Sequence, residues 1–508
     1  MQLKPVLVML VAIALIALGV WQLEGHKNGL SIHTDHVGTT PVTYYAPQSA
    51  APAPLVVIAH GFAGSRALME SYALALAQAG YLVASFDFEG HGRNPTPMSG
   101  DVEAIEGTTQ LLVDETLRVV EAGLTQVGTN GSAALLGHSM ASDIIVRAAS
   151  RDARIAAVVA ISPFSDAITA THPDKLLMIT GAWEPRLRAF ALDAARMVEP
   201  TASENESVQS TDVAAELQVM RQAFVAPNVE HVGVLYSRPG IEAARTWLNA
   251  AFERPQETDS AAVPLRIGWI FLVLTGTVLL VWPLAQWLPY RASSHQGLSS
   301  KGLLLALALP MLLAPALASV LPTGFLPVLV ADYLAVHMAL YGIVQLLILR
   351  VLGQRMLGNG LLGLQLSGFA IAAGMLVAAY GVLVFGFALD RYVANFLPHA
   401  GRLPIIAALA VGAVPFMIAD STMAHAHPKF WQRMLIRLAF LVSLGIAIAL
   451  DFEGLFFLIL IIPVIALFFL IFGLMGRWVE ARAGPLASGL GLGLLLAWSL
   501  GVTFPMFV

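Results

Sequence analysis

The sequence contains no cysteine and few charged residues. Asp, Glu, Lys and Arg together make up 12% of its 508 residues, about half the share found in ordinary soluble proteins. Without cysteine, the chain has no disulfide, no thiolate metal site and no cysteine nucleophile. Because 57% of the residues are hydrophobic, the composition argues against a fully soluble or disordered protein, and no basic patch indicates a nucleic-acid partner.

The second half of the chain has the composition of a membrane domain. Residues 266–508 hold 12 of the 28 basic residues but only 6 of the 33 acidic ones. Long apolar stretches lie at 267–288, 303–321, 325–349, 360–388, 404–420, 435–450, 454–475 and 484–507. Each approaches the about 20 residues that cross a bilayer as a helix. We therefore predict a transmembrane domain of about eight helices over residues 266–508.

A further apolar segment, residues 5–21, follows Lys4 near the N-terminus. It suits a cleaved signal peptide or an uncleaved anchor, and its length favours an anchor over residues 1–22.

The basic residues are distributed unevenly between the predicted connections. If the N-terminus is cytoplasmic, the outer connections of the later spans hold Arg391 and Arg402. The inner connections hold Lys4, Arg291, Lys301, Arg350, Arg355, Lys429, Arg433, Arg437, Arg477 and Arg482.

This asymmetry follows the rule that Lys and Arg gather in cytoplasmic loops. It predicts an integral protein of the cell (inner) membrane, in contact with the lipid bilayer. Residues 23–258, which have ordinary globular composition, would then form a domain in the periplasm or outside the cell.

Residues 23–258 show short β-rich runs alternating with helical patterns. The predicted strands lie at 55–59, 81–87, 133–136, 155–161, 176–180 and 224–226, and the predicted helices at 66–79, 105–126, 140–151, 186–198 and 239–252. This alternation predicts an α/β domain with a mostly parallel sheet flanked by helices. The acidic, Ser-containing stretch 199–211 is interpreted as a solvated insertion, as the start of a small cap, or as a plain linker.

Three motifs occur in order at the ends of predicted strands. They are His-Gly-Phe at 60–62, Asp-x-x-Gly-His-Gly at 87–92 and Gly-His-Ser-Met-Ala at 137–141. A serine on a tight turn from strand to helix projects its hydroxyl away from the sheet, and small residues two positions to either side allow the turn. A serine hydroxyl needs a base to become nucleophilic, and His231 lies just after the last predicted strand.

With these motifs, residues 38–253 resemble the α/β-hydrolase superfamily, especially its esterase, lipase and dienelactone-hydrolase-like branches. The resemblance implies that Ser139 is the nucleophile and His231 the base. It also implies an oxyanion hole made by the backbone N–H groups of Phe62 and Met140, and no cofactor. The triad acid is Glu184, where the family usually has aspartate, or alternatively Asp166 after the preceding strand.

These features support a membrane-bound serine hydrolase that cleaves an ester or related acyl bond of a lipid-like small molecule through an acyl-enzyme. Because the predicted spans exceed what anchoring needs, an acyltransferase to a lipid or glycan acceptor is an alternative. A non-catalytic transporter or scaffold with a hydrolase-like binding domain is the third interpretation, to which the intramembrane polar residues Asp332, His337 and Gln345 lend slight support. Asp420, His425 and His427 could bind a metal, although loop polarity explains them more simply, and no metal is predicted.

Overall fold

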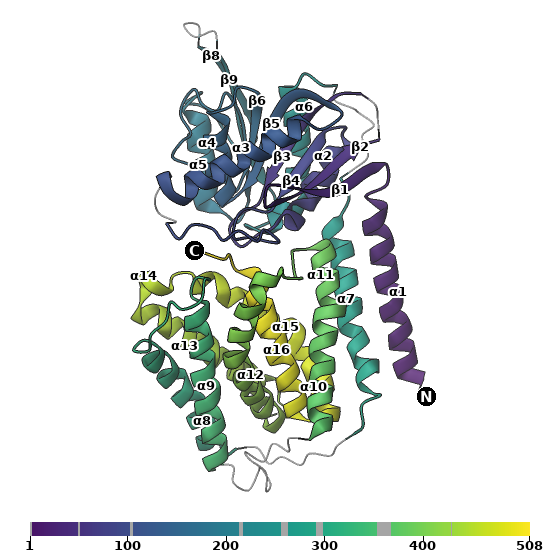
Figure 1. The fold of residues 1–508 in the computed structure, drawn as a ribbon, viewed down its shortest axis with the longest axis vertical. Coiled ribbons are helices and arrows are strands. Elements are labelled where there is room, and N and C mark those ends of the chain that lie inside the picture. Colours follow the sequence, from purple (N-terminus) through teal and green to yellow (C-terminus); the bar gives the residue numbers. More distant parts are fainter. Residues whose placement is uncertain are drawn as a thin grey trace. The chain divides into compact units, whose positions relative to one another are not determined.

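The computed structural model describes residues 3–48, 51–101, 105–212, 217–255, 263–290, 298–352, 367–427 and 429–508. These residues form two compact units, shown in Figure 1. One unit comprises residues up to Leu18 with 272–390 and 396–504. The other comprises residues 19–271 together with the short segments 391–395 and 505–508.

The unit around residues 19–271 is built on a mixed sheet, in which nine strands are described. Their order is β1-β2-β4-β3-β5-β6-β7-β9-β8, and the neighbours from β4 to β9 run parallel. The strands are β1 Leu30–Val37, β2 Thr40–Pro47, β3 Ala53–Ala59, β4 Leu82–Phe86, β5 Thr129–His138, β6 Ile155–Ile161, β7 Lys175–Gly181, β8 Ser207–Asp212 and β9 Leu217–Ala226. This arrangement agrees with the predicted mostly parallel sheet.

Helices cover both faces of this sheet. On β3, Val56 and Ile58 share a core with α2 (Glu70–Gln78) and α6 (Arg238–Ala251). Leu55 points to the opposite face, because side chains alternate along a strand, and there it lies against Gly123 at the end of α3. The helices α3 (Gln110–Leu124) and α4 (Met140–Ala149) pack together, and α5 (Pro185–Arg196) packs on β7 and β9.

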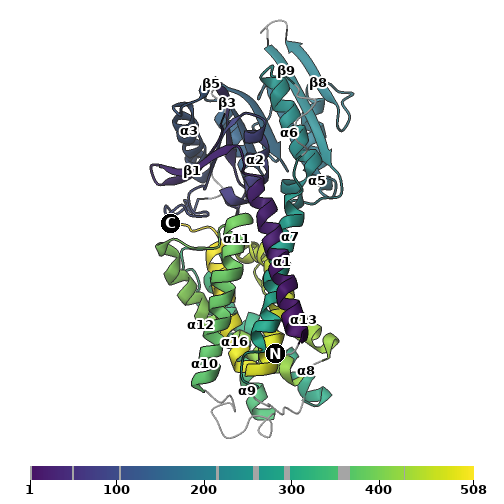
Figure 2. The ribbon, with the colours of Figure 1, turned by 90° about the vertical axis from the view of Figure 1, so that its right-hand side faces the viewer.

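The edges of the sheet were not predicted. Strands β1 and β2 form an antiparallel pair, and β8 and β9 form another, visible together at one edge in Figure 2. Part of the stretch 199–211, interpreted from sequence as an insertion, cap or linker, therefore belongs to an edge strand. β1 is exposed along most of its length, so it lacks the hydrophobic signal by which buried strands are recognised.

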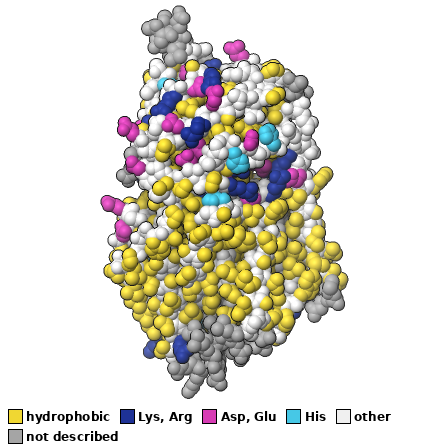
Figure 3. Space-filling view, in the orientation of Figure 1, with side chains coloured by type: hydrophobic (Ala, Val, Ile, Leu, Met, Phe, Trp, Pro, Cys, Tyr) yellow, Lys and Arg dark blue, Asp and Glu magenta, His cyan; other side chains and the backbone are white. Residues whose placement is uncertain are grey.

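The other unit is helical. Among the described residues, nine helices are long and apolar enough to cross a membrane, which indicates a membrane protein. They comprise α1 Leu3–Gly25, α7 Arg266–Ala285, α8 Ser300–Ala318, α9 Ala331–Leu352, α10 and its continuation Gly368–Tyr392, η6 with α12 Ala400–Ala426, α13 Phe430–Leu450, α15 Leu458–Ala483 and α16 Pro485–Thr503. Figure 3 shows apolar side chains over most of this unit's visible surface. The first residues of the predicted span 360–388, with Arg291 and Arg355, lie outside the described residues.

Close backbone packing holds the helical unit together. α16 is the most buried of the candidate spans. A Cβ added to Gly489 would lie 2.5 Å from the Cα of Ile418 on α12. A Cβ added to Gly493 would lie 2.6 Å from the Cα of Val414 on the same helix. Small residues at such contacts let membrane helices approach closely, which compensates for the weak hydrophobic drive inside lipid.

Candidate active site

Ser139 lies on a strained turn between β5 and α4. Its backbone has φ 53° and ψ −117°, a conformation uncommon for a residue with a side chain. A Cβ on Gly137 would lie 2.9 Å from both the carbonyl oxygen of Ala141 and Cδ1 of Ile145, so only glycine fits there. The tight turn thus places the Ser139 side chain beyond the end of the sheet.

A chain of hydrogen bonds connects Ser139, His231 and Glu184. Nε2 of His231 lies 3.0 Å from Oγ of Ser139, and Nδ1 lies 2.6 Å from Oε1 of Glu184. Because an ionised carboxylate only accepts hydrogen bonds, Nδ1 carries the proton and donates to Glu184. Nε2 of the neutral ring is then the acceptor for the Ser139 hydroxyl. The structure thus brings together three residues that the sequence singled out.

Glu184 is held in place as a carboxylate. It lies in the turn after β7, and its Oε2 accepts hydrogen bonds from Ser162 Oγ at 2.8 Å and from the Gly181 N–H at 2.6 Å. Burial raises the pKa of Glu184, but the hydrogen bonds from His231, Gly181 and Ser162 outweigh burial and leave the pKa below its usual value. Asp166, the other predicted acid, is exposed on the turn after β6.

Two residues that sequence reasoning did not assign to the site support this chain. His138 donates from Nε2 to the backbone carbonyl of His231 at 2.9 Å. Burial, together with the nearby His231, lowers the pKa of His138 to about 3, so His138 is neutral. Ser162, with a φ of 48°, fixes Glu184 from the end of β6. Their only sequence signal is position, since His138 precedes Ser139 and Ser162 directly follows the predicted strand 155–161.

The turn at residues 60–62 lies against Ser139. A Cβ on Gly61 would come within 3.0 Å of the Ser139 Cβ and 2.9 Å of His138 Nδ1. His60 shapes this turn, because its Nδ1 donates to the Gly61 carbonyl at 2.8 Å and its Nε2 accepts from the Phe88 N–H at 3.1 Å. Phe62 follows directly. Met140 is the first residue of α4, where backbone N–H groups have no acceptor within the helix.

Buried carboxyl groups stabilise the turn at residues 87–92. Asp87 accepts hydrogen bonds from the N–H groups of Arg66, at 2.8 Å, and Arg93, at 3.0 Å, and it is paired with the Arg66 guanidinium. Glu115 is fully buried nearby, where it accepts from Thr40 Oγ at 2.5 Å and from the Glu89 N–H at 3.0 Å. Burial raises the pKa of Glu115 to about 7.

Large apolar side chains are exposed next to the hydrogen-bonded residues. Phe164 is 61% exposed two positions after Ser162, Trp183 is 65% exposed just before Glu184, and Val232 is 48% exposed just after His231. The Phe164 ring also packs on Phe190 of α5, with ring centroids 5.7 Å apart. We call Phe164, Trp183 and Val232 the apolar rim. Each of the three lies within two positions of Ser162, Glu184 or His231 in the sequence.

The polar residues noted within the predicted spans form structural contacts in the helical unit. Asp332 accepts hydrogen bonds from the backbone N–H of Phe325, before α9, and from that of Tyr333 within α9, and His337 binds Ser443 at 3.0 Å. Asp420 faces Arg437 at 3.8 Å, whereas His425 binds Glu480 at 3.0 Å. Across the described part of the chain, no group of three or more His, Asp or Glu side chains could hold a metal ion.

A comparison with known protein families concerns the fold of the domain that holds these residues. The family model described as "Serine aminopeptidase, S33" matches residues 50–227. This match confirms the predicted α/β-hydrolase fold of the first domain, and the apolar helices fit the predicted fusion to a helical region. No curated protein matches the chain.

Solved structures similar to this chain include hydrolases. A predicted CIB-like hydrolase from Thermoplasma acidophilum is 12% identical over 44% of this chain and 100% of its own, with a TM-score of 0.34. A Thermus thermophilus protein is 18% identical over 44% of this chain and 100% of its own, with a TM-score of 0.31. An epoxide hydrolase from Vigna radiata is 23% identical over 27% of this chain and 42% of its own, with a TM-score of 0.22.

Proposed function

Since residues 50–227 carry an α/β-hydrolase domain, we propose that this protein is a membrane-bound serine hydrolase that cleaves a carboxylic ester or related acyl bond. The observation that supports this most directly is the chain of hydrogen bonds from Ser139 through His231 to Glu184. In this chain the Nδ1–H of His231 is directed at the Glu184 carboxylate, so that Nε2 can accept the proton of the Ser139 hydroxyl, as nucleophilic catalysis requires.

In the proposed reaction, Ser139 Oγ attacks the acyl carbonyl while His231 Nε2 takes the hydroxyl proton. The charge that develops on the carbonyl oxygen is stabilised by the N–H groups of Phe62 and Met140, each contributing about 3 kcal/mol. The tetrahedral intermediate collapses, the C–O bond to the leaving alcohol breaks, and His231 returns the proton to that alcohol. Water, activated by the same His231, then releases the acid from Ser139. Glu184 stabilises the imidazolium in both steps.

The apolar rim supports an acyl substrate. Phe164, Trp183 and Val232 are exposed apolar residues that flank Ser162, Glu184 and His231 in the sequence, and apolar side chains of this kind suit a hydrocarbon chain. An aminopeptidase would instead need a carboxylate for the ammonium group of its substrate. Glu230, the carboxyl next to His231 in the chain, already accepts hydrogen bonds from the N–H groups of Val232 at 2.7 Å and Gly233 at 2.8 Å.

The proposal places the hydrolase domain on the extracytoplasmic side of a cell (inner) membrane, with the lipid bilayer as partner. The distribution of basic residues along the sequence supports this orientation. Transfer of the acyl group to a lipid or glycan hydroxyl is the second candidate, because the helical unit is larger than an anchor requires and could present an acceptor.

The first test compares ester hydrolysis by the full-length protein in detergent. p-Nitrophenyl butyrate and palmitate are the substrates, and Ser139→Ala is compared with Ser150→Ala, a control at an exposed serine at the end of α4. We expect turnover that Ser139→Ala abolishes and Ser150→Ala retains, with a preference for the long chain. Product appearing on an added lipid alcohol instead of free acid would favour the acyltransferase. A folded protein without either activity would refute both and favour a binding or transport role.

A further inference from the structure

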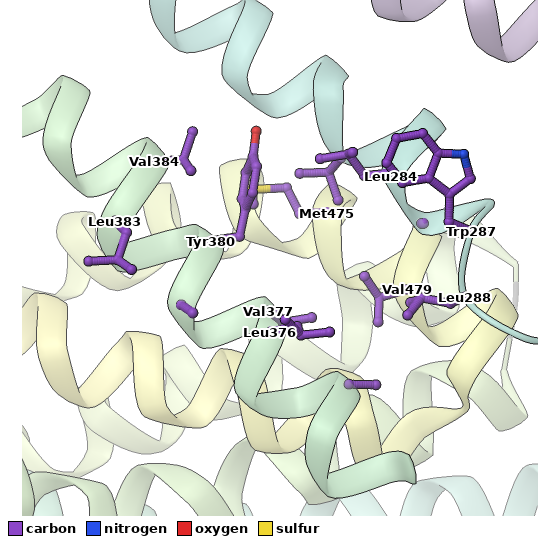
Figure 4. Close-up of a pocket in the computed structure, with 14 residues that line it drawn as sticks. Leu284, Trp287, Leu288, Leu376, Val377, Tyr380, Leu383, Val384, Met475 and Val479 are labelled. Atoms are coloured by element: carbon purple, nitrogen blue, oxygen red, sulfur yellow. The ribbon is translucent and has the colours of Figure 1, made fainter.

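A large apolar cavity lies within the helical unit, far along the sequence from the residues of the active site. Its volume is about 580 Å³, within the range of sites that hold small organic ligands. Its walls come from the end of α7, from α10 with the following residues to Val384, and from α15. Figure 4 shows these side chains, including Leu284, Trp287, Leu376 and Met475, around the open space.

The chemistry of the lining excludes most polar ligands. Every lining residue is Ala, Val, Leu, Met, Trp or Tyr. The hydroxyl of Tyr380 is already used, since it donates to the backbone carbonyl of Thr277 on α7 at 2.6 Å. Leu376 and Leu383 line the cavity and are also exposed, so the cavity opens on the lipid-facing surface of the unit. A hydrocarbon chain entering sideways from the bilayer matches this lining.

A cation lies at one end of the cavity. Arg482 follows the lining residue Val479 by one turn of α15, and its Nη2 donates to the Gln286 carbonyl, beside the lining residue Trp287, at 2.6 Å. Its guanidinium lies 5.9 Å from the centre of the exposed Tyr290 ring. The Nε of Arg482 is buried and has no hydrogen-bond partner among the described residues. Arginine beside Trp and Tyr is typical of the boundary between hydrocarbon and headgroups.

The cation identifies which lipid fits best. An acyl chain gains little by leaving the bilayer for an equally apolar cavity, so retention of one lipid must come from its headgroup. Arginine binds phosphate through charge-assisted hydrogen bonds. We propose that this cavity binds one anionic glycerophospholipid, with an acyl chain between α7, α10 and α15 and the phosphate at Arg482. The basic residues of the sequence assign this end of the cavity to the cytoplasmic leaflet.

The test uses the full-length protein, purified in detergent, stripped of lipid and titrated with phosphatidylglycerol or phosphatidylcholine. Retained lipid is counted by native mass spectrometry. Ala379→Trp fills the cavity from an exposed lining position, and Ala372→Trp is its control at an exposed alanine of the same helix that does not line the cavity. Arg482→Gln removes the cation, and Arg477→Gln removes an exposed arginine elsewhere on α15.

We expect one phosphatidylglycerol to be retained about fivefold better than phosphatidylcholine, the factor that one basic residue contributes near an anionic lipid. Ala379→Trp should abolish retention and Arg482→Gln should abolish the preference, while both controls behave like the unmodified protein. Retention that Ala379→Trp leaves unchanged would overturn the proposal, as would equal retention of both lipids. A dimer that Ala379→Trp converts to monomer would assign the cavity to a second copy of the chain and also overturn it.

Discussion

Replacing Glu184 with glutamine should disable the base without removing a contact. Oε2 of Glu184 receives two donors, Ser162 Oγ at 2.8 Å and the Gly181 N–H at 2.6 Å. In Glu184→Gln the amide oxygen will occupy this position, because turning the NH₂ group toward it would leave the Gly181 N–H, which can only donate, unpaired at about 1–3 kcal/mol. The NH₂ group therefore faces His231.

His231 must then accept at Nδ1 and carry its proton on Nε2, toward Ser139. In this tautomer it cannot take the serine proton. Replacing the orienting carboxylate by its amide in a serine protease triad lowers kcat by about 10⁴, which corresponds to about 5 kcal/mol of transition-state stabilisation. We expect a loss of about 10³ to 10⁴ in kcat for the ester that the protein hydrolyses best, with little change in KM.

The assay measures kcat and KM together with the melting temperature, so that loss of activity is separated from loss of folding. Asp166→Asn, at the exposed alternative acid, is the matched control and should retain full activity. The reasoning is refuted if Glu184→Gln keeps more than about a tenth of kcat, or if Asp166→Asn loses as much as Glu184→Gln.

Three further predictions concern the site's support, its pH dependence and the membrane orientation. His138→Phe removes the hydrogen bond to the His231 carbonyl and should slow fluorophosphonate labelling of Ser139 about fivefold, the effect of about 1 kcal/mol; an unchanged rate would contradict a positioning role. In the folded protein the pKa of Glu115 is about 7, above its ordinary 4.5, because burial favours the protonated form. The stability that Glu115 contributes is therefore full below about pH 4.5 and is lost as the pH rises through about 7. Between pH 5 and 8 the free energy of unfolding should fall by on the order of 2 kcal/mol. Thermal unfolding of Glu115→Gln should lack most of this pH dependence, and a slope equal to that of the unmodified protein would show that another group causes it. Because the chain has no cysteine, Val127→Cys on the hydrolase domain should react with an impermeant maleimide in intact cells and Ser300→Cys only after permeabilisation, whereas the reverse pattern would overturn the proposed orientation.

The sequence predicted the centre of the hydrolase domain well, for a physical reason. Strands such as β3, Ala53–Ala59, are buried along their whole length and read as continuous apolar runs. The edge strands β1 and β8 were missed because they are polar and are defined by pairing with β2 and β9. Helix lengths in the membrane unit were predictable because about 20 apolar residues are needed to cross a bilayer.

The candidate site was predictable only where a motif marks it. Ser139 lies in a recognisable turn sequence, and His231 and Glu184 follow strands in the order that the resemblance implies. The support from His138 and Ser162 depends on hydrogen bonds to His231 and Glu184, and a bond between residues 93 positions apart leaves no local pattern. The same holds for the apolar cavity, because its walls come from helices that are distant in sequence.

The central claim, that Ser139 is a nucleophile activated by His231, is tested most directly by mass spectrometry of the full-length protein after reaction with a fluorophosphonate. The account predicts one adduct per chain, located on Ser139, that is absent from Ser139→Ala and strongly reduced in His231→Ala, while Ser150→Ala labels normally. A folded protein that gains no adduct, or one that is labelled at another serine while Ser139 stays unmodified, would contradict it.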